Sequence, residues 1–191
     1  MRTRTTAVAV SVGLLLTVTA CGSTSESPEA ATTTVLPPAA TTSTPEPTTP
    51  PAPEAMAMGS TLKWDEGDIS GTSAALSYKQ GIKSVGSAAE ETGEPDYVWA
   101  ALELKVCSTK GTFSATTFPW TLAYADGARI EPSSSTWDDF PKPEFPLETK
   151  LTAGKCVRGK VVYPVPGNSR PETIVYAPDG VDPVEWTVPA K

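Results

Sequence analysis

Residues 97–107 show the clearest alternation of apolar and polar positions in the chain. The even positions of this stretch hold five apolar side chains: Val98, Ala100, Leu102, Leu104 and Val106. Glu103 and Lys105 stand between them. A period of two is typical of a strand with one buried face. The pattern therefore predicts a β-strand whose even-numbered side chains face a hydrophobic core.

Shorter stretches with strand character follow the same logic on both sides of this one. They are residues 61–64, 74–78, 118–124, 129–131, 155–166, 173–176 and 184–188. Turn-forming sequences such as Asp126-Gly127 separate them, and residues 81–95 read as a polar, glycine-containing loop. Within 118–124 we expect one face to be apolar, formed by Phe118, Trp120, Leu122 and Tyr124. No stretch has a helical period, so we predict an all-β sandwich of about seven strands.

The first residues have the pattern of an export signal. Arg2 and Arg4 precede a fourteen-residue apolar run, Ala7–Ala20, which is too short to span a bilayer. The run ends in Val18-Thr19-Ala20-Cys21-Gly22, which resembles a bacterial lipobox. The resemblance implies cleavage before Cys21, acylation of Cys21, and a chain anchored on the extracytoplasmic face of the cell membrane. The alternative is an ordinary signal peptide with an accidental cysteine.

A change in composition marks the domain organisation. Residues 22–58 consist almost entirely of Ser, Thr, Pro, Ala and Glu, and such a stretch cannot bury enough apolar surface to fold. We expect three regions: a lipoprotein signal peptide at 1–20, a lipidated Cys21 with a disordered Thr/Pro-rich linker at 21–58, and a β-sandwich domain at 59–191.

The three cysteines have separate fates in this interpretation. If Cys21 carries lipid, Cys107 and Cys156 remain to form a disulfide. Cys107 lies off the even-numbered apolar face of its strand, and Cys156 lies off the apolar face defined by Val157, Val161 and Tyr163. Both thiols are therefore predicted to point outward, as a cross-link between neighbouring strands near a sheet edge. A redox-active pair is disfavoured because no Cys-x-x-Cys spacing is present.

Composition excludes several kinds of chemistry. The chain has no histidine, which excludes Ser-His-Asp and Cys-His catalysis as well as imidazole metal ligation. Asp65, Glu66 and Asp68 carry oxygen ligands but lack the spacing of a calcium loop. We expect no metal, no cofactor and no enzymatic activity. A net charge of −7 without a basic stripe also argues against nucleic acid as a partner.

The candidate binding region is the aromatic and proline-rich connection 132–146. Its candidate residues are Trp137, Asp138, Asp139, Phe140 and Phe145. Aromatic side chains held by prolines can form a preorganised binding surface, and the nearby carboxylates would suit a cationic or sugar-like partner. The alternative is that this loop folds back and caps the open end of the sandwich.

Four stretches together suggest a family. Residues 97–107, 118–127, 151–159 and 161–166 resemble the immunoglobulin-like domains of unknown function carried by secreted actinobacterial lipoproteins, related to the mycobacterial immunoprotective extracellular antigen. The resemblance implies an immunoglobulin-like antiparallel β-sandwich outside the cell, with no agreed catalytic residues. In many members a polar residue replaces Cys107. The expected role is non-catalytic display of the domain toward a protein or glycan of the envelope. The alternative is envelope maintenance without a specific ligand.

Overall fold

A computed structural model of the protein describes residues 54–190. It contains eleven strands and one short helix. In chain order they are β1 (Met56–Ala57), β2 (Leu62–Glu66), β3 (Ile69–Ile82), α1 (Ala88–Thr92), β4 (Tyr97–Lys110), β5 (Thr112–Thr116), β6 (Trp120–Ala123), β7 (Arg129–Ile130), β8 (Glu148–Thr152), β9 (Cys156–Pro166), β10 (Thr173–Tyr176) and β11 (Val184–Thr187). Within residues 54–190, α1 has only five residues, and no helix there could span a bilayer.

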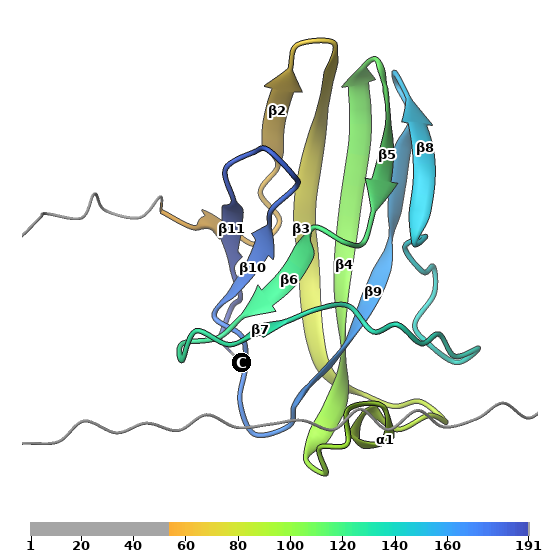
Figure 1. Cartoon of the computed structure of the whole chain (residues 1–191), viewed down its shortest axis with the longest axis vertical. Helices are drawn as coiled ribbons and strands as arrows, with labels where there is room; N and C mark the ends of the chain where they lie inside the picture. Colours follow the sequence, from red (N-terminus) through yellow and green to blue (C-terminus); the bar gives the residue numbers. More distant parts are fainter. Residues whose placement is uncertain (1–53, 191) are drawn as a thin grey trace, which may run out of the picture. The chain divides into compact units, whose positions relative to one another are not determined.

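Two main sheets pack face to face (Figure 1). One has the strand order β2-β3-β4-β9 and the other β1-β11-β10-β6-β7, while β5 and β8 form a separate pair. The core between the sheets contains fully buried side chains from both: Leu102, Leu104, Trp120, Leu122, Tyr163, Ile174 and Trp186. The predicted all-β sandwich is therefore confirmed.

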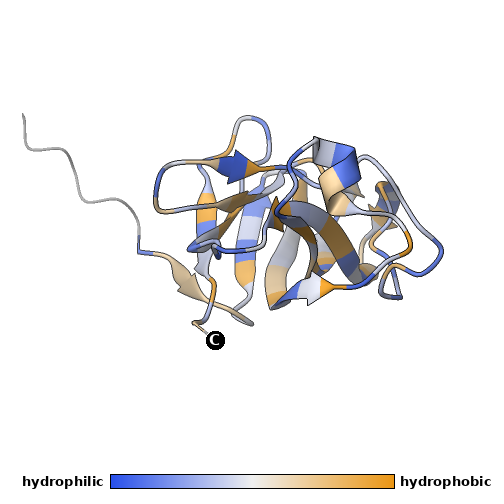
Figure 2. Ribbon diagram, turned by 90° about the horizontal axis from the view of Figure 1, so that it is seen from below, coloured by the Kyte–Doolittle hydropathy of each residue, from blue (hydrophilic) through white to orange (hydrophobic). Residues whose placement is uncertain are grey.

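The alternation predicted for residues 97–107 is also confirmed. Leu102 and Leu104 of β4 are fully buried, and β4 pairs antiparallel with β9 so that Leu102 lies opposite Val161. Val161 and Tyr163 of β9 are buried on the same face. Figure 2 shows bands of hydrophobic and hydrophilic residues on the strands. Burial of the face that packs against the other sheet thus sets the register of the β2-β3-β4-β9 sheet, which we call the long sheet.

The structure adds three strands that the sequence pattern does not reveal. β5 and β8 have polar, threonine-containing sequences and pair only with each other. β1 pairs in parallel with β11, so the sandwich is not wholly antiparallel. β1 also lies before residue 59, within the range assigned to the linker. The folded region therefore includes Met56. The rest of that linker up to residue 53, Cys21 and the predicted signal peptide lie outside the described residues.

Phe118 was predicted on the apolar face of a strand, and this prediction is wrong. Its side chain is 87% exposed, whereas Trp120 and Leu122 are fully buried. The reason is a tight turn, in which the Trp120 amide donates to the Thr117 carbonyl over 3.2 Å. Because β6 begins only at Trp120, Phe118 lies outside the alternating register.

The loop predicted at 81–95 contains α1, a helix too short to show a helical period in the sequence. Its Ala88 packs on the outer face of the long sheet, in a second small core with Trp99, Phe140 and Val162. Both faces of β4 are therefore covered near this end of the sheet.

Candidate functional site

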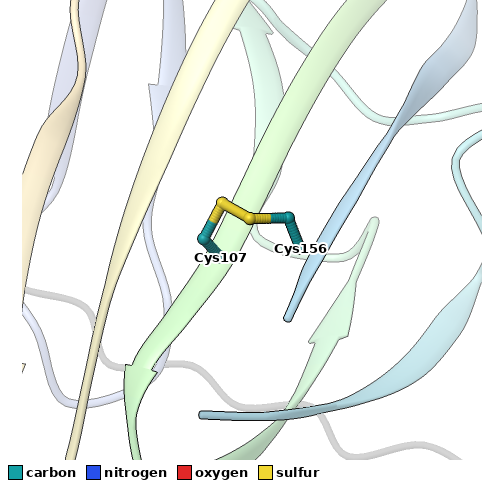
Figure 3. The surroundings of a disulfide bond; sticks show 2 residues. All are labelled: Cys107 and Cys156. Carbon is teal, nitrogen blue, oxygen red and sulfur yellow. A yellow bond between two sulfur atoms is a disulfide. The ribbon is translucent and has the colours of Figure 1, made fainter. Parts of the chain in front are cut away.

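The disulfide joins Cys107 of β4 to Cys156 of β9 (Figure 3). The two residues are direct cross-strand partners with Cα atoms 4.0 Å apart. The Ser108 amide donates to the Lys155 carbonyl over 2.9 Å, which makes the cysteines a non-hydrogen-bonded pair, the position where side chains approach most closely. β9 is the end strand of its sheet. The predicted cross-link between neighbouring strands near a sheet edge is thus present.

An ion pair lies close to the disulfide on the same two strands. Arg158 Nε donates to Glu103 Oε1 over 2.9 Å, and Ser77 Oγ donates to Glu103 Oε2 over 3.3 Å. The hydrogen bond from Arg158 is the main reason that the pKa of Glu103 is lowered from its ordinary value. The disulfide and the Glu103–Arg158 ion pair hold β4 and β9 together, and neither offers a free nucleophile.

The candidate binding loop 132–146 buries two of its aromatic side chains. Phe140 is 3% exposed and makes an edge-to-face contact with Trp99, with ring centroids 5.1 Å apart. Phe145 is 5% exposed and belongs to the main core. Neither side chain is presented to a partner. The expectation that they help form a binding surface is therefore not supported by their positions.

The other three candidates lie at the surface of this loop. Trp137 is 39% exposed, and its ring lies so close to Gly86 that a Cβ added there would be 2.1 Å from it. Asp139 accepts hydrogen bonds from Ser84 Oγ and the Val85 amide, both at 2.8 Å. Asp138 is exposed. These contacts fasten the loop to the segment before α1.

The same loop also covers the free edge of β9. The Lys160 amide donates to the Pro143 carbonyl, and the Phe145 amide donates to the Lys160 carbonyl, both over 2.9 Å. Gly159 leaves room for the loop, because a Cβ there would be 2.5 Å from the Glu144 carbonyl. These contacts favour a loop that folds back onto the sandwich over a binding loop, but the part they cover is the edge of β9 and not the open end.

A cleft that sequence reasoning missed lies between β5 and the turn that joins β10 to β11. Two adjoining cavities of about 300 and 220 Å³ share five lining residues: Phe113, Ser114, Tyr176, Pro178 and Asp179. The first extends toward Phe118 and Trp120, and the second toward Trp64 on β2. We call this feature the aromatic cleft.

Aromatic side chains from four parts of the chain line the aromatic cleft. Trp64 and Phe113 meet edge to face with centroids 4.9 Å apart, and Trp120 and Tyr176 lie 4.5 Å apart. Phe118 projects into solvent at one end. The sequence could identify these residues as aromatic, but only the placement of β5 shows that some of them border an open cleft.

The charges of the aromatic cleft have one sign. Glu66, Asp179 and Asp182 are among its lining residues, and no lysine or arginine is. None of the three carboxylates takes part in an ion pair in the described part of the chain. They do not form a metal site either, because residues 54–190 contain no group of three or more potential metal ligands close enough together.

The two packed sheets, β2-β3-β4-β9 and β1-β11-β10-β6-β7, define the chain as a β-sandwich protein. Comparison with solved structures shows the same fold in MPT63, a secreted protein from Mycobacterium tuberculosis, with a TM-score of 0.54 and 16% sequence identity. The match covers 71% of this chain and 98% of that protein. The fold implied by the family resemblance is thereby confirmed. No protein-family profile and no curated protein sequence matches the chain.

Proposed function

We propose that the protein is an extracytoplasmic lipoprotein, anchored to the membrane through Cys21, that displays a non-catalytic β-sandwich for interactions in the envelope. The observation that carries this proposal is the Cys107–Cys156 disulfide. Cys107 is half-buried and Cys156 is exposed. Such bonds persist in oxidising compartments and are rare in the cytosol. The lipobox-like sequence before Cys21 supplies the anchor.

Several features support a binding role rather than a catalytic one. The sequence has no histidine to activate a nucleophile, and Cys107 and Cys156 are tied to each other. The aromatic cleft instead combines large apolar surfaces with a few carboxylates, which is the usual composition of a recognition site. We assign the interaction to the aromatic cleft and a structural role to the 132–146 loop.

A second candidate function is envelope maintenance without a specific ligand. The packing of Phe140 and the hydrogen bonds of Asp139 favour it, because they use the predicted binding loop for stability. A deletion strain separates the two functions. Complementation by a Phe118→Ala variant as complete as by the wild type would support the structural role, whereas a residual defect would support binding.

The anchor is tested by intact-mass analysis of the protein purified from cells that process lipoproteins. We expect a mature chain beginning at an acylated Cys21, located in the membrane fraction, with no free thiol at Cys107 or Cys156. The matched control is Cys21→Ser, which should leave the membrane fraction and keep the disulfide. An unmodified residue 21 together with two free thiols would overturn the proposal.

A further inference from the structure

We infer that the aromatic cleft binds an extended peptide segment of a partner protein through a lysine or arginine side chain. This inference rests on the proposed function as an interaction domain and specifies the chemistry of the partner. It depends on four properties of the cleft: its volume, its charge, its aromatic walls and the free edge of β2.

The volume and shape of the cleft suit an elongated occupant. Its two cavities measure about 300 and 220 Å³ and join at Phe113 and Tyr176. Together they fall in the range of sites that hold ordered ligands. One long side chain and its neighbours along a peptide would fill both, whereas a single small ion would fill neither.

The charge of the cleft determines the sign of the occupant. Asp179 lines both cavities, and Glu66 and Asp182 line the second. All three are exposed residues, and no cation among residues 54–190 pairs with them. Electrostatic complementarity therefore selects a positively charged group.

The aromatic walls suit a cation on an aliphatic stem. Trp64, Phe113 and Tyr176 are half-buried, so parts of their rings remain accessible in the cleft. Aromatic faces attract ammonium and guanidinium groups, and the methylene stems of lysine and arginine pack on apolar surface. Phe118 at the other end offers an exposed ring for the rest of the peptide.

The position of β2 favours a peptide over a free cation. β2 is an end strand that pairs only with β3 in the described sheets. Its Leu62, Trp64 and Glu66 line the second cavity. An extended segment added along an open strand edge gains backbone hydrogen bonds and places alternate side chains on one face. A basic side chain on that face would lie beside Trp64 and Glu66.

The test is isothermal titration calorimetry of the full-length chain purified from its own cells, in a non-ionic detergent, with the peptide acetyl-Thr-Lys-Thr-Lys-Thr-amide. The matched control peptide carries acetylated lysines, and spermidine and chitotetraose serve as further probes. We expect the basic peptide to bind, and the acetylated peptide to bind at least about tenfold more weakly because its cations are removed. Spermidine and chitotetraose should bind more weakly than the basic peptide.

Two variants locate the binding. Asp179→Asn/Asp182→Asn should weaken binding of the basic peptide about tenfold, and Phe118→Ala about fivefold. Phe118 is exposed, so its variant should keep the fold. The control is Glu90→Gln/Glu94→Gln, which changes the net charge equally, within α1 and just after it, at the opposite end of the long strands (Figure 1). This control variant is expected to lose less than about twofold in affinity for the basic peptide.

Three results would overturn the inference. Equal binding of the acetylated peptide would remove the need for a cation, and equal loss in the Glu90/Glu94 control would show attraction to an acidic surface in general. Tighter binding of spermidine or chitotetraose would assign the cleft to a free polyamine or a glycan. None of these results depends on the lipid at Cys21, so the anchor and the peptide site fail or succeed separately.

Discussion

Tyr163 illustrates how a single residue connects the two sheets. It lies on β9, is fully buried, and donates a hydrogen bond from its hydroxyl to the Trp120 carbonyl on β6 over 3.2 Å. Burial raises the pKa of this hydroxyl above its ordinary value. Desolvation likewise raises the pKa of Tyr124 to about 12. The core therefore requires neutral tyrosines.

We predict that Tyr163→Phe lowers the free energy of unfolding at pH 7 by about 1 kcal/mol, the usual contribution of one hydrogen bond. The pH dependence should also change. In the unfolded chain Tyr163 releases its proton near pH 10, and in the folded protein only at higher pH. The contribution of Tyr163 to the free energy of unfolding is therefore complete below pH 10 and decreases as the pH rises above 10. The variant should lose less stability between pH 9 and 11 in urea titrations. If the free energy of unfolding fell equally with pH in the wild type and in Tyr163→Phe, Tyr163 would not be the source of this pH dependence.

At the scale of elements, the 132–146 loop protects a strand edge. Hydrogen bonds with Lys160 attach it to β9, and Phe140 anchors it against Trp99 on β4. Exposed strand edges promote association between molecules, and a covering loop prevents it. The loop therefore occupies part of the free edge of β9, where another strand could otherwise pair.

Phe140→Ala should lower the free energy of unfolding by about 3 kcal/mol, because it removes a buried ring from the small outer core. Phe118→Ala is the matched control, since it makes the same chemical change at an exposed position and should cost less than about 0.5 kcal/mol. Chemical denaturation measures both. Equal losses would show that the loop does not anchor itself through Phe140.

The elements that could be predicted from the sequence are those with a strong period. β4 and β11 were recognisable because burial of one face leaves an alternation, as at Leu102 and Leu104, whereas β9 and β10 contain short runs of consecutive buried apolar residues, such as Ile174 and Val175. β5 and β8 bury little and pair only with each other, so their sequences carry no such signal. β1 has two residues, and its pairing with distant β11 depends on the whole fold.

The candidate site was less predictable than the fold. The outward direction of Cys107 and Cys156 followed from parity, because residue spacing fixes the face of a strand. The aromatic cleft did not, because Trp64, Phe113 and Tyr176 meet only after β2, β5 and β10 have been placed in space. The loop residue Phe140 looked like a surface aromatic because its burial depends on Trp99 of another strand.

At the scale of the whole molecule, the disulfide limits how far the chain can unfold. It connects residues 49 apart in the sequence and closes across β4 and β9, the two strands that contribute most to the core of the long sheet. A cross-link of this kind acts largely by reducing the entropy of the unfolded chain. The disulfide therefore stabilises the whole domain against unfolding, and its effect is not limited to the contact between Cys107 and Cys156.

Cys107→Ser/Cys156→Ser should lower the free energy of unfolding by about 4 kcal/mol, from the loop-length dependence of cross-link entropy. The measurement is urea unfolding of the oxidised wild type and the double variant. Reduction of the wild type with dithiothreitol provides the control and should give a similar loss. A difference below about 1 kcal/mol would show that the bond does not contribute to stability in this way.

The pairing of β1 with β11 has a mechanical consequence. Met56 and Ala57, at the amino-terminal end of the described domain, are held by Trp186 and Thr187 near its carboxy-terminal end. A force applied to the chain from the amino-terminal side therefore acts first on the two-residue pairing of β1 with β11. The disulfide lies on strands of the other sheet. Under force, β1 should separate from β11 before the sheet that contains the disulfide unfolds. A few residues would then extend while the rest of the domain stays folded.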